Sequence, residues 1–359
     1  MTNISTLGQA FDQIERIKTM QTSLATLQYQ IASGKKTNLF KGLGSDVIFS
    51  ERSRANFTSL DKFMNNIDIA NRRMKLMEKG LSEIQTQTRN VVGSLEVETQ
   101  QGEFDMHVVG DLANNVYDYL LDLINVQDGD RYLYGGAETL TKPLTDAGAM
   151  DTYLSTQLND WIAGNIDNQQ LMDSFTDRTQ LNDTLVGYSA PLASGNAKDV
   201  FVRVDDHAEI EYTTLANSDG LRDILVAVSM IKKITSTMDE VTRETDDPVT
   251  LVTSPGATKQ EQNDNFYTVY NKLAEMLTGA LDKIDTQRFN LSQKQAQITQ
   301  IQNGHKQEQA TLLDTISNVE DADVNEIAVK LNAMQVQLEA SFRVTASLQS
   351  LSLVNFMPL

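Results

Sequence analysis

Apolar residues recur every three or four positions at the start of this 359-residue chain, which is the spacing of one face of an α-helix. The pattern ends at Ser33-Gly34-Lys35-Lys36, where the glycine can take the left-handed conformation that ends a helix and the lysines face the negative end of its dipole. We therefore predict a first helix that stops near residue 33. Its apolar positions are Ile4, Leu7, Phe11, Ile14, Ile17, Met20, Leu24, Leu27 and Ile31.

The end of the chain has the same periodicity. Its apolar positions are Val324, Ile327, Leu331, Met334 and Leu338, followed by Phe342, Thr345, Leu348 and Leu351. Both ends are thus predicted to form coiled-coil stripes. A single helix with one apolar face is marginally stable alone, so we expect these helices to lie side by side and to bind other copies of the chain.

The residues that we predict at these subunit contacts are Leu7, Phe11, Ile14, Leu24, Leu27, Ile31, Ile327, Leu331, Met334, Leu338, Leu348 and Leu351. The alternative is ordinary packing within one chain, as in a helical bundle.

Two long helices are predicted between these ends. Ser45-Asp46 offers an N-cap, and no proline follows until at least Leu95, so a helix of about 50 residues should span about 75 Å. A second long helical pattern covers about 259–318, and shorter ones cover 104–126 and 221–234.

Strand signals are confined to the middle of the chain. Residues 200–204 and 208–212 alternate apolar and polar side chains around a turn, which predicts a β-hairpin, and Asp128-Gly129-Asp130 predicts a tight turn. Between about 143 and 190 the periodicity weakens and the single tryptophan, Trp161, appears, so we expect a small domain there.

The predicted fold class is mainly α: a long α-helical coiled-coil stem formed by the N- and C-terminal halves, with a small mixed α/β central domain. Three domains are expected. They are the terminal helices at 1–40 and 319–359, a helical rod with a short β-hairpin at 41–142 and 220–318, and a central outer domain with a β-hairpin at 143–219.

Composition limits the kinds of partner and site that we expect for this chain. A formal net charge of -19 repels phosphate backbones and anionic lipid surfaces, so neither nucleic acid nor a membrane is expected as a partner. The absence of cysteine excludes disulfides and thiolate metal sites. Met1-Thr2-Asn3-Ile4-Ser5 lacks the features of a cleaved secretory signal, and no run of roughly 20 apolar residues predicts a membrane span.

No candidate for catalysis or cofactor binding emerges. His107, His207 and His305 lie far apart in the sequence, and a calcium loop from Asp128 would need a glycine where Leu133 stands. Phosphate-binding glycine loops, nucleophile elbows and zincin helices are also missing, so we predict no enzyme, no cofactor and no metal. The methionines at Met64, Met74 and Met77 are interpreted as core rather than as a partner groove.

Three local motifs resemble those of the flagellins and flagellar hook-associated proteins. Ile31-Ala32-Ser33-Gly34-Lys35-Lys36 is similar to the Ser-Gly-basic signature at the end of their first helix, and 130–136 (Asp-Arg-Tyr-Leu-Tyr-Gly-Gly) resembles the Gly-Arg-Tyr-Leu-Phe-Gly-Gly run of the hook-filament junction proteins next to the filament. The segments 338–342 and 351–356 resemble the ending of those junction proteins. One departure is 43–47, where the acidic Asp-Asp-Pro run of the family is replaced.

The resemblance implies an extracellular structural subunit of the bacterial flagellum, exported unfolded through the flagellar type III apparatus without a cleaved signal peptide. Its implied role is to join hook to filament for motility. Its implied partners are copies of itself, another hook-associated protein, flagellin, and an export chaperone at the C-terminal helix. The alternatives are a flagellin, which is the filament subunit itself, a helical interaction protein unrelated to motility, and, most remotely, an enzyme.

Overall fold

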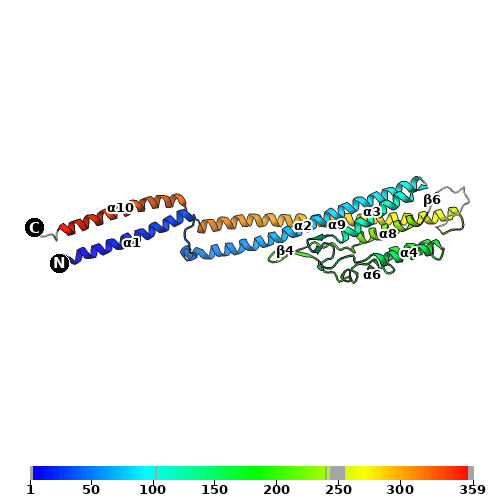
Figure 1. The fold of residues 1–359 in the computed structure, drawn as a ribbon, viewed down its shortest axis with the longest axis horizontal. Coiled ribbons are helices and arrows are strands. Elements are labelled where there is room, and N and C mark those ends of the chain that lie inside the picture. The colour runs from blue at the N-terminus through cyan, green and yellow to red at the C-terminus, as the bar shows by residue number, and fades with distance from the viewer. Residues whose placement is uncertain (1–2, 102, 239–240, 243–254, 355–359) are drawn as a thin grey trace. The chain divides into compact units, whose positions relative to one another are not determined.

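The computed structural model describes residues 3–101, 103–238, 241–242 and 255–354 (Figure 1). Side chains are described for residue 8 and for 11–96, 105–238 and 255–347. The chain forms two compact units. We call Met1–Lys62 with Asn303–Leu359 the terminal unit and Phe63–Gln302 the central unit.

Both ends of the chain meet in the terminal unit. Helix α1 (Asn3–Ser33) and helix α10 (Val324–Val354) lie side by side, at the blue and red ends of the colour scale in Figure 1. Helix α1 ends at Ser33, as predicted, because Gly34 takes a left-handed backbone (φ 67°) and its N–H donates to the Gln30 carbonyl (2.9 Å).

The two predicted long helices are confirmed. Helix α2 (Val47–Gln101) begins directly after Ser45-Asp46, following the short 3₁₀ helix η1 (Phe40–Asp46). Helix α9 (Lys259–Glu320) is the second. Each begins in one unit and ends in the other.

In the central unit, α3 (Met106–Ile124) packs against α8 (Asp219–Thr237). Asp105 caps α3, since its carboxylate accepts from the N–H groups of His107 (3.0 Å) and Val108 (3.1 Å). These helices bury a shared apolar face, and Met74 and Met77 of α2 are buried in the same core, as predicted. Met64, predicted with them, is only half-buried.

Strands form only short antiparallel pairs among the described residues. The pairs are β1 (Glu103–Phe104) with β6 (Val241–Thr242), β2 (Gln127–Asp128) with β3 (Arg131–Tyr132), and β4 (Phe201–Asp205) with β5 (Ala208–Glu211). The second pair confirms the predicted turn at Gly129, and the third confirms the predicted hairpin, with Val202 opposite Ile210. The predicted fold class, mainly α with little strand, is therefore confirmed.

Short helices fill the segment where periodicity was weak. They are α4 (Gly148–Ile162), α5 (Asn168–Thr176), α6 (Asp183–Val186) and α7 (Ala190–Ala193). Trp161 is fully buried, and its indole N–H donates to Asn168 Oδ1 (2.8 Å). It belongs to the same buried cluster as residues of α3 and α8. The division of the chain into three domains stays a prediction.

A tightly packed turn follows β3. Gly136 has a left-handed backbone (φ 66°), and a Cβ added there would lie 2.7 Å from the Lys198 carbonyl oxygen. Gly195 has nearly the same backbone (φ 68°), but a Cβ there would meet nothing within 4 Å. Substitutions at the two glycines therefore separate the cost of backbone strain from the cost of a steric clash.

We expect Gly136→Ala to destabilise the central unit clearly more than Gly195→Ala. Both substitutions should cost about 1–2 kcal/mol for left-handed alanine, and only the first adds a clash with a backbone carbonyl. Urea unfolding followed by the fluorescence of Trp161 measures both losses. Equal losses would contradict this account of Gly136.

Candidate subunit interface

The terminal helices α1 and α10 pack along one seam. On α1 the half-buried apolar residues are Ile17, Met20, Leu24, Leu27 and Ile31, and on α10 Ile327 is buried while Leu331, Met334 and Leu338 are half-buried. The Ser341 hydroxyl lies 3.9 Å from Met20 Sδ across the seam. Seven predicted subunit-contact residues therefore lie on the faces that pair within one chain: Leu24, Leu27, Ile31, Ile327, Leu331, Met334 and Leu338.

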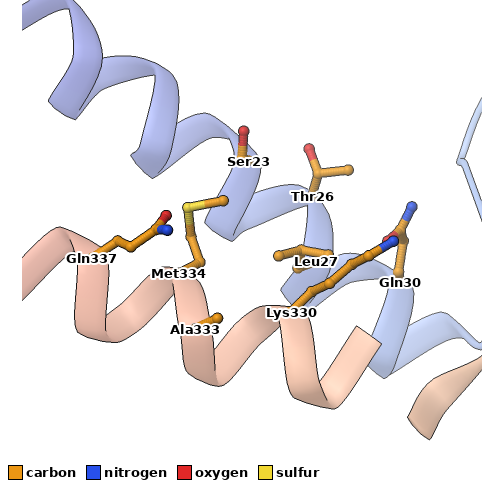
Figure 2. A pocket seen from close by; sticks show the side chains of 8 residues that line it. All are labelled: Ser23, Thr26, Leu27, Gln30, Lys330, Ala333, Met334 and Gln337. Atoms are coloured by element: carbon orange, nitrogen blue, oxygen red, sulfur yellow. The ribbon is translucent and has the colours of Figure 1, made fainter. Parts of the chain in front are cut away.

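The seam does not close over its own apolar side chains. Figure 2 shows Leu27 of α1 and Met334 of α10 pointing into the space between the helices. This space is a groove of about 430 Å³, whose other lining residues are Ser23, Thr26, Gln30, Lys330, Ala333 and Gln337. The two helices thus leave part of the apolar contact between them accessible to water.

Phe11 and Ile14 lie outside the seam and are exposed. The reason is the spacing: the stripe takes three successive steps of three residues between Phe11 and Met20. Each step turns the position back by about 60°, so the three together rotate the stripe about half a turn around the helix. The nine apolar positions of α1 consequently do not form a single face. The side chains of Leu7, Leu348 and Leu351 lie outside the described residues.

Backbone hydrogen bonds, which we call the clasp, join the segment after α1 to the turn between α9 and α10. Lys35 and Asp321 form an antiparallel β-bridge. The Lys36 N–H donates to the Glu320 carbonyl (2.7 Å), and the Ala322 N–H donates to the Gly34 carbonyl (2.9 Å). The Lys36 ammonium also donates to the carbonyls of Asn318 (2.7 Å) and Val319 (2.9 Å). It thereby satisfies the free carbonyls at the end of α9, where a cation also complements the helix dipole.

Charged side chains surround this clasp. The Glu320 carboxylate is buried and accepts two bonds from the Arg54 guanidinium, at 2.8 Å from Nε and 2.5 Å from Nη2, as well as one from the Ser50 hydroxyl. The Lys35 ammonium lies 2.5 Å from Asp321 Oδ1 and 3.5 Å from Glu320 Oε2. Hydrogen bonds from Arg54, opposed by burial, lower the pKa of Glu320 to about 2. The hydrogen bond with Asp321 raises the pKa of Lys35.

The motif at 130–136 has a packing role in the central unit. Tyr134 is fully buried, and its hydroxyl donates to the Met77 carbonyl of α2 (3.3 Å). Asp128, just before the motif, pairs with Arg72 (2.8 Å) and Arg73 (3.2 Å), and the bond from Arg72 is the main cause that lowers its pKa. Its carboxylate is therefore engaged by two cations.

The remaining candidates for chemistry are scattered. His107 and His207 are exposed, while His305 is buried on α9. Within the part of the chain that the structure describes, there is no group of three or more metal-ligating side chains, and no helix is both long and apolar enough to cross a membrane.

Replacing Glu320 tests the charged clasp. We expect Glu320→Gln to destabilise the terminal unit by about 2 kcal/mol at neutral pH, a value already reduced for the partial exposure of Arg54. Because the folded pKa is lowered from 4.5 to about 2, the stabilisation is present above about pH 5 and is lost as the pH falls towards 2. Thermal unfolding followed by circular dichroism across this range measures the difference from the wild type. Glu308→Gln, an exposed position on α9, is the control, and a loss from Glu320→Gln that stays constant down to pH 2 would refute the clasp.

Comparison with known proteins places these features in a family. Residues 4–138 match the family model of the bacterial flagellin N-terminal helical region, and residues 274–357 match that of the bacterial flagellin C-terminal helical region. Among solved structures, the chain is similar to a protein assigned as a flagellar hook-associated protein from Vibrio parahaemolyticus. The identity is 12% and the TM-score 0.42, over 76% of this chain and 96% of that chain. No curated protein matches the chain.

The two family matches include α1, α10, the clasp between them and the 130–136 motif, and together they span more than half of the chain. The chain therefore belongs to the bacterial flagellin family, which includes the hook-associated proteins, and is a structural subunit of the flagellum.

Proposed function

We propose that this chain is the hook-filament junction subunit next to the filament, rather than the filament flagellin. The observation that carries the proposal is the 130–136 run, which is similar to the Gly-Arg-Tyr-Leu-Phe-Gly-Gly run of junction proteins. Its side chains are integral to the fold here, since Tyr134 is buried against α2 and Gly136 is fixed by its close approach to Lys198. The sequence ending at 351–356, similar to that of junction proteins, adds support.

In this proposal the terminal helices, 1–40 and 319–359, form the inner assembly domain. The other two proposed domains are the rod at 41–142 and 220–318 and the outer domain at 143–219. Members of this family assemble with copies of themselves and with other axial proteins of the flagellum, and the half-covered seam of α1 and α10 supplies apolar surface for such contacts. The proposed neighbours are another hook-associated protein and flagellin.

The proposed route is export through the flagellar type III apparatus, with a chaperone guarding the C-terminal helix, to the extracellular flagellum. A chain without disulfides and with terminal helices that share only one narrow seam costs little to unfold before threading. The proposed role is structural and needs no catalytic activity.

Leu331 tests the assembly role of the seam. Leu331→Asp should cost the terminal unit roughly 2–5 kcal/mol and prevent incorporation into flagella. The central unit, read by Trp161 fluorescence, should stay folded. Asn332→Asp, an exposed neighbour with the same added charge, is the control. Normal incorporation of the Leu331 variant would contradict the assembly role of the seam.

Cells that lack the gene test the junction role. We expect electron microscopy to show hooks without filaments, with flagellin shed into the medium, because subunits would be exported with no junction to hold them. Loss of secreted flagellin with intact hooks would indicate instead an export fault or the flagellin itself. Normal filaments would overturn the proposal, and elongation of filament fragments by the purified chain would favour the flagellin alternative.

A further inference from the structure

The central unit holds a groove of about 650 Å³ that none of the predicted subunit-contact residues lines. One wall is the segment 211–215, which begins at the last residue of β5, and the other is helix α9 with Gln287, Leu291 and Lys294. All of these residues belong to Phe63–Gln302, so the groove lies within one compact unit. It is therefore present in the single folded chain.

Segment 211–215 continues the extended backbone of β5. The side chains at 210, 212, 214 and 216 are buried and those at 211, 213 and 215 are half-buried, which is the two-residue alternation of a strand. The N–H groups of Tyr212 and Ala216 donate to the carbonyls of Val200 (3.0 Å) and Tyr134 (2.9 Å), within the fold. The backbone groups of the alternate residues 211, 213 and 215 therefore point the other way, towards an open edge.

This edge has unused backbone groups. Strands β4 and β5 form a two-stranded sheet, so no third described strand covers it. Among the described residues, no hydrogen bond engages the Thr213 carbonyl or the Leu215 N–H, and the Thr213 N–H donates only to the Glu211 carboxylate (2.9 Å). An unpaired edge of this kind is a template for another strand. From 211 to 215 it spans about 13 Å, which is room for about five residues.

Two further polar atoms at the groove lack partners. Gln287 Oε1 on α9 and Ser218 Oγ, just before α8, are shielded from solvent and have no hydrogen-bond partner within the described part of the chain. Both residues line the groove. Because buried polar atoms are normally hydrogen-bonded, these two indicate positions that a bound molecule would fill.

The charges and apolar side chains of the groove limit the kind of molecule. Asp199 and Glu211 line it against one cation, Lys294, so a ligand with basic groups is favoured over an acidic one. Leu215 and Leu291 also line it and offer contacts to an apolar side chain. An added strand supplies backbone groups for the edge and alternating side chains for these contacts.

We propose that this groove binds an extended peptide of about five residues, with alternating basic and apolar side chains, as an added strand on segment 211–215. The peptide belongs to a partner protein. The inference goes beyond the proposed function and does not rest on it, because the groove is complete in the single chain.

Titration of the purified full chain with acetyl-Val-Lys-Val-Lys-Val-amide tests the proposal. Amide NMR signals of Glu211, Thr213 and Leu215 should shift and saturate at millimolar peptide or below, and the peptide with glutamate in place of lysine should bind more weakly. Two further peptides are N-methylated, either at the lysines or at the valines. Since a strand pairs through alternate residues, only one of these two should lose binding.

The other outcomes overturn the inference. Retained binding of both N-methylated peptides, or loss of both, would contradict pairing through alternate backbone groups. No saturable shift at millimolar peptide would mean that the edge is closed to an added strand. Shifts of the same amides with maltose, but not with the peptide, would assign the groove to a sugar instead.

Gln287→Ala gives an independent readout. Because Gln287 Oε1 has no partner in the described chain, the variant should keep the thermal stability of the wild type, yet bind the peptide about fivefold more weakly. Gln293→Ala, exposed on α9 and outside the groove, is the matched control and should change neither property. Equal affinities of the two variants, or a loss of stability without a loss of affinity, would overturn the role of Gln287 in the groove.

Discussion

The two ends of the chain are held together by one seam, and two helices can cover only one face of each other. In the terminal unit this constraint decides which apolar residues remain available for contacts outside the seam. The seam takes up Leu24, Leu27, Leu331 and Met334, yet leaves a groove along its own length. The far faces of α1 and α10 remain apolar and exposed. Such a unit forms one apolar contact within the chain and leaves further apolar faces uncovered, as a family of self-assembling subunits requires.

The clasp at Lys35 and Glu320 determines where the seam begins. Gly34 ends α1, Lys36 caps the end of α9, and Glu320 holds Arg54, Ser50 and Lys35 around one buried carboxylate. A buried carboxylate is tolerable only when its hydrogen bonds are met, and removal of a partner would leave a costly charge. The register of α1 against α10 is therefore fixed by polar contacts, while their attraction comes from the apolar seam.

Much of the fold was predictable because its signals are local. Gly34 marks the end of α1, Ser45-Asp46 marks the start of α2, and the alternation on both sides of 205–207 marks a hairpin. The pairing of Arg54 with Glu320 could not be predicted, since 266 positions separate them and neither belongs to a recognisable motif. The subunit-contact prediction followed apolar spacing without helical phase, so it grouped Phe11 with Leu24 although about 140° around the helix separates them.

The central claim is that α1 and α10 are incompletely covered in the single chain and are completed by assembly. Hydrogen exchange measured by mass spectrometry, on the free subunit and on assembled flagella, tests this most directly. The account predicts that amides of α1 and α10 exchange much faster than those of α3 and α8 in the free subunit, and become protected on assembly. Protection of α1 and α10 equal to that of α3 and α8 in the free subunit, unchanged by assembly, would contradict it.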